Sequence, residues 1–226
     1  MKYGLRSLFV SSLELILFQT LVHEADEANR RERNMKLTTA FRIYPKAIMW
    51  SAILSSALIM EGYDTAVIGS VYAYPSFLNV FGIRAPDGTL TISPAWQNGI
   101  SGATNAGEVI GLQIAGYLSE RAGYRWTLIA ALTVMIGLIF FPFFANSLTV
   151  FLIGELFQGI SWGVFQTMTT AYAAEVCPVP LRHYLTAYVN LCWIIGQFIS
   201  AGILRGLVDR QDVWGWKIPF AVQWVW

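Results

Sequence analysis

The sequence is poor in charge. Lys, Arg, Asp and Glu make up 13% of the chain, about half of the roughly 25% that is usual in soluble domains. Hydrophobic residues account for 55% and aromatic residues for 15%. This apolar excess excludes a disordered chain and indicates a lipid bilayer as the solvent. The 15 basic and 14 acidic residues give a net charge of +1, which is too balanced for a protein whose main partner is a nucleic acid.

Cysteine and histidine are also scarce. The chain has two cysteines, Cys177 and Cys192, and two histidines, of which His183 lies near the first cysteine. Neither a disulfide scaffold nor the ligand spacing of a zinc site can be built from these residues. We therefore expect no metal and no cofactor, and we expect both cysteines to be packing residues.

Long apolar runs dominate what remains. A helix needs about 20 apolar residues to cross the hydrocarbon core of a bilayer, and five runs are long enough. They cover residues 47–77, 94–118, 126–145, 148–172 and 184–204. A sixth run begins at Ile218 and is still apolar at the last residue, Trp226. We expect an all-α membrane protein with five complete transmembrane helices and the start of a sixth, and we interpret the chain as a fragment.

The positions of Lys and Arg predict the orientation, because positively charged loops stay on the cytoplasmic side. Most basic residues near the spans precede the first span or lie in the second-to-third and fourth-to-fifth loops. Residues 1–46 are therefore expected to form a cytoplasmic tail, and residues 47–226 a transmembrane half-bundle. Within the tail, apolar residues at helical spacing between Leu5 and Val22 favour a helix in the membrane interface; an incidental extension is the alternative.

Four carboxyl groups are expected at membrane depth, and they are Glu61, Asp64, Glu108 and Glu155. Each costs about 2.5 to 3.5 kcal/mol at the bilayer centre. Protonation, pairing or hydration must relieve this cost, and a proton-coupled permeation path contains all three. Glu61 and Asp64 lie one helical turn apart, so one negative charge disfavours the other, and the pair could take up and release a proton. Shallow, solvated positions or cation partners elsewhere are the alternative.

Two stripes of different character run along the second span. The polar stripe carries Asn98, Ser101, Asn105 and Glu108 at helical spacing. The opposite stripe has small residues every four positions, Gly99, Ala103, Gly107 and Gly111, and such a stripe lets a neighbouring helix approach closely. We expect one face to be wet and the other to pack, although the polar residues could instead only join helices.

Amides and indoles alternate along the fourth and fifth spans. In the fourth span, Gln158, Trp162 and Gln166 follow Glu155 at helical spacing. In the fifth span, the residues at helical spacing are Asn190, Trp193 and Gln197. A sugar needs donors and acceptors for its hydroxyls and an aromatic ring for its C–H face, so this pattern favours a sugar site. An ion channel would not need the indoles. Tryptophan in membrane helices also serves in packing or in interfacial belts.

Several motifs resemble those of a known family. Residues 116–125 (GYLSERAGYR) are similar to the loop signature between the second and third helices of major facilitator superfamily transporters. Residues 173–182 (AAEVCPVPLR) resemble the sugar-porter signature after the fourth helix. The segments 60–64, 94–97, 159–166 and 188–197 are similar to the fungal maltose and alpha-glucoside permease branch. The resemblance covers about residues 35–226.

This resemblance implies a twelve-helix, plasma-membrane symporter that moves alpha-glucosides with protons. Two six-helix halves would enclose one sugar site and open alternately to each side, and this chain would be most of the N-terminal half. Its partners would then be an alpha-glucoside, protons, the lipid bilayer and the missing C-terminal six-helix half, with no nucleic acid. The chain departs from the general pattern at Glu155, where arginine is usual, and this puts an acid-to-arginine proton relay in doubt.

The loop motifs imply cytoplasmic gating residues, and these are Gly116, Glu120, Arg121, Gly123, Arg125, Glu175 and Arg182. Gly123 permits a tight turn, and the arginines could clamp helices in the outward-facing state. Simple positive-inside anchoring is the alternative. In this motif Glu120 replaces the commoner aspartate, and Tyr124 replaces a basic residue.

Taken alone, such a half would expose its polar face. We therefore expect that the chain does not transport by itself and that it is not an enzyme. The alternatives are a membrane sugar sensor that does not transport, and an oligomeric channel or scaffold that uses the glycine faces.

Overall fold

The computed structural model describes residues 18–27, 30, 35, 37–86 and 88–225. Residues 18–27 are helical, and the rest of the expected interfacial helix, before residue 18, lies outside the described residues. The later elements are α2 (Leu37–Ile43), α3 (Pro45–Ser55), α4 (Ala57–Val71), α5 (Pro75–Phe81), β1 (Ile83–Arg84), β2 (Leu90–Thr91), α6 (Pro94–Leu138), α7 (Phe140–Phe143), α8 (Leu148–Val176), α9 (Val179–Leu207), α10 (Trp214–Val222) and the 3₁₀ turn η1 (Gln223–Val225).

The expected first span, 47–77, is interrupted twice. α3 and α4 are separated at Ser56, whose hydroxyl donates to the carbonyl oxygen of Ile53 at 2.6 Å, a local bond that competes with the helix. α4 and α5 are separated before Pro75, which restricts Tyr74 to an extended conformation. The expectation of one uninterrupted helix was therefore wrong in its boundaries.

The second and third spans are two helices that share the label α6 and meet at a sharp turn at Gly123. Gly123 has a φ of 76° and a ψ of 164° inside this element. Residues with a side chain adopt this backbone conformation only with strain. α6 begins with Ser93 as its cap, whose side chain accepts from the N–H of Ala95 at 3.3 Å, and with Pro94 in the first turn. The tight turn expected at Gly123 is confirmed.

The later helices begin earlier than expected. α9 starts at Val179 rather than Tyr184, with proline in its first turn. α10 starts at Trp214 rather than Ile218, because Lys217 does not interrupt it. The Lys217 ammonium lies 5.6 Å from the ring centroids of both Phe143 and Trp216, and such contacts stabilise the cation beside an apolar surface.

Three helices among the described residues are long and apolar enough to cross a membrane, and they cover Pro94–Phe143, Leu148–Val176 and Val179–Leu207. The first of these contains two expected spans, on either side of Gly123. The first expected span is not among them, because it is divided into α3 and α4, which have 11 and 15 residues and are each too short to cross a membrane.

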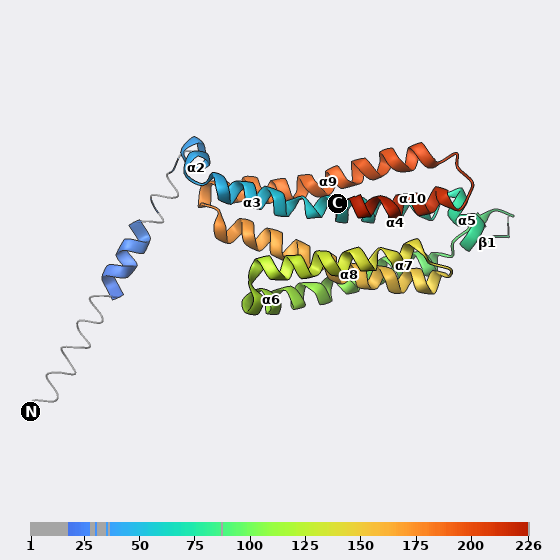
Figure 1. The fold of residues 1–226 in the computed structure, drawn as a ribbon, viewed down its shortest axis with the longest axis horizontal. Coiled ribbons are helices and arrows are strands. Elements are labelled where there is room, and N and C mark those ends of the chain that lie inside the picture. The colour runs from blue at the N-terminus through green and yellow to red at the C-terminus, as the bar shows by residue number, and fades with distance from the viewer. Residues whose placement is uncertain (1–17, 28–29, 31–34, 36, 87, 226) are drawn as a thin grey trace, which may run out of the picture.

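The helices form two closely packed pairs, α6 with α8 and α4 with α9. Figure 1 shows α9 alongside α3 and α4, and α6 alongside α8. In each pair the backbones touch at glycines. A Cβ on Gly107 or Gly111 of α6 would overlap the backbone of α8, and one on Gly159 or Gly163 of α8 would overlap that of α6. The close approach expected at Gly107 and Gly111 is confirmed, whereas a Cβ on Gly99 would meet only the Leu152 side chain, at 3.7 Å.

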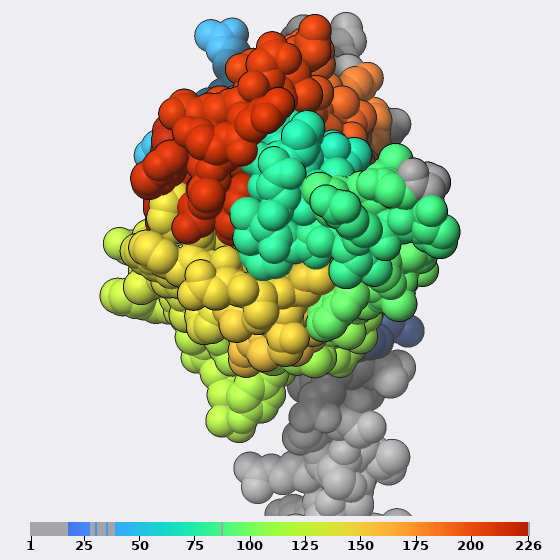
Figure 2. Space-filling view, turned by 90° about the vertical axis from the view of Figure 1, so that its right-hand side faces the viewer, coloured from blue at the N-terminus to red at the C-terminus, as the bar shows by residue number. Residues whose placement is uncertain are grey.

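Aromatic side chains close the end of the bundle that carries α5. The ring of Phe77 lies 4.7 Å from that of Phe81, 5.7 Å from that of Phe151 and 5.5 Å from that of Trp216. In Figure 2 this end faces the viewer, and α5 lies between the C-terminal segment and the start of α8. The core at this end therefore joins residues from widely separated parts of the chain.

Candidate functional site

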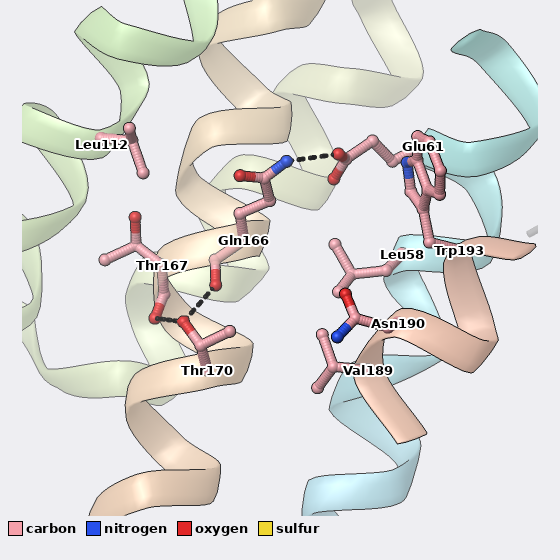
Figure 3. A pocket seen from close by; sticks show the side chains of 9 residues that line it. All are labelled: Leu58, Glu61, Leu112, Gln166, Thr167, Thr170, Val189, Asn190 and Trp193. Atoms are coloured by element: carbon pink, nitrogen blue, oxygen red, sulfur yellow. Dashed lines mark hydrogen bonds between the residues drawn. The ribbon is translucent and has the colours of Figure 1, made fainter. Parts of the chain in front are cut away.

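Two cavities lie between the helix pairs and share three wall residues, Glu61 of α4, Gln166 of α8 and Trp193 of α9. The first, the Asn190 cavity, has a volume of about 510 Å³. Its other wall residues are Leu58, Leu112, Thr167, Thr170, Val189 and Asn190 (Figure 3). The second, the Asn105 cavity, has a volume of about 380 Å³. Its other wall residues are Thr65, Ile68, Gly69, Ser101, Thr104, Asn105 and Glu108.

A hydrogen bond joins the two helix pairs where the cavities meet. The Gln166 side-chain nitrogen donates to Glu61 Oε1 at 2.6 Å. Glu61 is buried, and its Oε2 has no hydrogen-bond partner. The arrangement therefore brings together one residue expected to carry a proton and one expected to contact a sugar.

Asp64 lies on the same helix but is held from a different direction. It is buried, and its Oδ1 accepts from the side-chain nitrogen of Gln223 in η1. Sequence reasoning missed Gln223, because it is a single amide in the last apolar run and no spacing marked it. The two carboxylates of the expected proton pair thus have different amide partners.

Glu155 and Gln158 are fully buried on α8. Neither side-chain oxygen of Glu155 nor either side-chain polar atom of Gln158 has a hydrogen-bond partner within the described part of the chain. Trp162 is 1% exposed and lies in an apolar cluster with Phe165 and Met168. These three residues, expected at a proton or sugar site, are placed in the packed interior and are not among the wall residues of the two cavities.

The polar stripe of the second span is divided along its length. Ser101, Asn105 and Glu108 line the Asn105 cavity, and Glu108 is half-buried. Asn98, nearest the start of α6, is exposed and is not among the wall residues of either cavity.

The fifth span contributes two of its three expected residues to the cavities. Asn190 and Trp193 are wall residues, and Trp193 borders both cavities. Gln197, one turn further along α9, is half-buried and lies outside both sets of wall residues. An amide and an indole therefore face the same space, as a sugar site requires.

The expected gating residues lie at the opposite end of the bundle from α5. The arginines there form no ion pair within the described chain. Arg121 lies 4.3 Å from the ring centroid of Tyr117, and Arg182 donates to the carbonyl oxygen of Cys177 at 3.0 Å. Glu120 and Gly116 are exposed, and Arg125 lies 5.9 Å from the ring centroid of Trp126.

Tyr124 makes the contact that the arginines do not. Its hydroxyl donates to Glu175 Oε2 at 2.7 Å and so joins the bend in α6 to the end of α8. Tyr124 is the residue that replaces a basic one in the loop motif. A hydrogen bond from an uncharged phenol to Glu175 therefore stands at the position where the loop motif has a basic residue.

Both cysteines are buried and free, and each lies in an apolar cluster, which confirms their packing role. Burial raises the pKa of the Cys177 thiol, which lies between α8 and α9. Among the described residues, no group of three or more His, Cys, Asp and Glu side chains could hold a metal ion.

Comparison with known proteins adds sequence relatives. A family model described as "Sugar (and other) transporter" matches residues 50–226. The chain is 42% identical over 206 residues to the general alpha-glucoside permease of Saccharomyces cerevisiae, and 43% identical over 213 residues to a maltose permease of that yeast. These alignments cover 90% and 93% of this chain but 33% and 35% of the relatives. The chain thus spans about a third of the length of the curated relatives that it matches.

Solved structures agree in fold. The chain is 25% identical to a major facilitator superfamily proton:xylose symporter, XylE, solved with 6-bromo-6-deoxy-D-glucose, with a TM-score of 0.62 over 81% of this chain and 42% of the symporter. The partially occluded, inward-open form of XylE from E. coli gives 26% identity and a TM-score of 0.57, over 80% of this chain and 47% of the other.

Proposed function

This chain belongs to the sugar transporter family, and on that premise we propose that it forms the N-terminal part of a carrier that moves alpha-glucosides together with protons. The family is one of membrane transporters rather than enzymes. The fold is the N-terminal helical bundle of a major facilitator superfamily transporter, and the protein is a multi-pass membrane protein. An alpha-glucoside is proposed as the substrate because the relatives are an alpha-glucoside permease and a maltose permease.

The meeting of the two cavities carries this proposal. Glu61 is a carboxyl group, Gln166 an amide and Trp193 an indole, and all three border both cavities. The amide and indole suit a sugar's hydroxyls and C–H face, and the carboxyl group suits a proton. Substrate and proton sites placed at one point between helices are what a coupled carrier needs.

The environment of the carboxylates supports proton coupling. Within the described chain, Glu61, Asp64, Glu108 and Glu155 form no ion pair with a basic side chain. A lone charge at membrane depth is costly, so a proton is the simplest means of neutralising these groups. We place proton uptake and release on Glu61 and Glu108, which border the Asn105 cavity. Asp64 and Glu155 are buried and border neither cavity, so we assign them no direct part in proton uptake.

A second helical half is part of the proposal. The relatives are about three times as long as the chain, and transporters of this kind bind substrate between structural repeats. The cavities between the helix pairs would then face the second half. We further propose a plasma-membrane location with the N-terminus in the cytoplasm, supported by the excess of basic residues on that side.

Transport in a yeast strain without maltose permeases tests the proposal. The chain is produced alone and together with the C-terminal two thirds of the general alpha-glucoside permease, and uptake of labelled maltose and external pH are recorded together. We expect saturable uptake with alkalinisation of the medium only when both parts are present. The C-terminal part produced alone is the control.

Three other results would contradict the proposal. Saturable uptake without proton movement would indicate a uniporter. Maltose binding with no flux in the completed protein would favour a sensor. Conductance that does not saturate would favour an oligomeric channel.

A further inference from the structure

The two cavities lie on opposite sides of the Glu61–Gln166 hydrogen bond along the bundle. On α4, Leu58 precedes Glu61 and lines the Asn190 cavity, whereas Ile68 follows Glu61 and lines the Asn105 cavity. On α8, which runs the other way, Thr170 follows Gln166 and lines the Asn190 cavity. The hydrogen bond therefore lies at the boundary between the cavities, beside any solute that passes from one to the other.

The Gln166 amide has two ends with different surroundings. Its nitrogen is bonded to Glu61, and Figure 3 shows its oxygen turned away from Glu61, towards the side of the cavity where Leu112 lies. The amide can thus accept from a sugar hydroxyl with its oxygen. Its nitrogen can donate to a sugar hydroxyl only if its hydrogen bond to Glu61 is broken.

The strength of the hydrogen bond between Gln166 and Glu61 depends on the charge of Glu61. An N–H bond to a carboxylate is roughly twice as strong as one to a neutral acceptor. The titratable groups that act on Glu61 are Asp64 on its own helix and Glu108 on α6. The wall residues on α8 and α9 beside it, Gln166 and Trp193, are neutral. With no cation among these groups, a proton is what loosens the bond.

We infer that Gln166 is the coupling residue of the proposed symport: its amide is held by Glu61 in the empty carrier and is released to a sugar hydroxyl when Glu61 takes up a proton. This inference rests on the proposed function. The proton binds Glu61 Oε1 or Oε2 and leaves from the same group after the sugar. Because coupling between two sites is reciprocal, protonation of Glu61 and sugar binding favour each other.

Substitution of Gln166 tests the coupling in the completed carrier described above. The Gln166→Leu variant keeps the approximate size of the side chain but cannot bond Glu61 or a sugar. We expect the KM for maltose to rise about tenfold and its dependence on pH between 5 and 7 to disappear. Gln113→Leu, the same change at an exposed glutamine of α6, is the matched control and should keep the wild-type pH profile.

Substitution of Glu61 provides the second arm. Glu61→Gln imitates the protonated state, so the amide should be free at every pH. We expect maltose counterflow, which needs no proton gradient, to persist with a KM that does not change with pH. The double variant Glu61→Gln/Gln166→Leu should lose no further pH dependence, because both changes act on one bond.

The outcomes separate this inference from the function on which it rests. If wild type shows no sugar-dependent proton movement, the proposed function fails. If wild type is coupled and Gln166→Leu keeps the wild-type change of KM with pH, the inference is overturned. If Gln166→Leu does not reach the membrane, the Glu61→Gln result decides, and a pH-dependent KM in that variant overturns the inference.

Discussion

The contacts within the two helix pairs differ in kind from the contacts between them. Inside the α6–α8 and α4–α9 pairs, backbones meet at glycines with no room for a Cβ. Between the pairs lie the two cavities and the hydrogen bond from Gln166 to Glu61. Each pair is thus closely packed, and the polar walls of the two cavities lie between the pairs.

This difference indicates where motion is inexpensive. Separating α6 from α8 would break close backbone contact along several turns, and the dispersion energy of such contact is large in sum. Next to the cavities, one side-chain hydrogen bond joins α4 to α8, and water or a sugar can replace it. Stability and transport should therefore respond to different residues.

The largest effect on stability is expected inside the α6–α8 pair. A side chain at Gly159 would overlap the carbonyl oxygen of Thr104 and lie against the nitrogen of Glu108, and neither backbone atom can move without the helix. We expect Gly159→Val to cost about 3 kcal/mol. Thermal unfolding of the chain in detergent measures this. Gly137→Val, with no neighbouring atom within 4 Å of its Cβ, is the control, and equal loss in both variants would refute the packing argument.

The α4–α9 pair should respond in the same way to a smaller change. A methyl group at Gly196 would overlap the backbone of Ile59 and Tyr63. We expect Gly196→Ala to cost about 1 to 2 kcal/mol of stability, whereas Gly202→Ala on the same helix, with open space around it, should gain about 0.5 to 1 kcal/mol. The same unfolding measurement compares the two. A stable Gly196→Ala variant would mean that this pair can slide.

A much smaller loss of stability is expected between the pairs. Gln166→Leu removes a single hydrogen bond at the edge of two cavities, so it should cost about 1 kcal/mol although it abolishes pH-dependent coupling. Thermal unfolding of this variant beside Gln113→Leu gives the measurement. A loss as large as that of Gly159→Val would show that the cavities are part of the rigid scaffold.

The smallest effect is expected at the exposed end of the bundle. Tyr124→Phe removes the hydrogen bond to Glu175 at a surface position, and we expect a loss of about 0.5 kcal/mol. If this end of the bundle gates the carrier, the rate of maltose counterflow should change although the stability hardly does. If neither quantity changes, the bond only accompanies the bend at Gly123.

The glycines at the helix–helix contacts differ in how well the sequence pattern predicted those contacts. The small residues of α6 repeat every four positions, and this period predicted that Gly107 and Gly111 lie against a neighbouring helix. Gly62 and Gly196 approach the opposite backbones just as closely, but neither has another glycine three or four positions away in its helix. A glycine without such a neighbour carries no period, so the α4–α9 contact could not be predicted.

The same limit applies to the site. Helical spacing predicted that Glu61, Gln166 and Trp193 lie on polar faces, and all three border the cavities. Spacing equally marked Glu155, Gln158 and Trp162, which lie in the packed interior. Along one helix, a polar stripe gives the direction of a side chain, whereas the neighbouring helix decides whether a cavity or a packed core meets it.

The sequence by itself determined that the protein is a helical membrane protein, because runs of about 20 apolar residues and a shortage of charge leave no other stable structure. Its motifs also identified the family. The tertiary structure alone decided that Gln166 meets Glu61 and that Gln223 meets Asp64, 105 and 159 residues apart. Such contacts depend on the packing of whole helices against one another, and no local period in the chain records that packing.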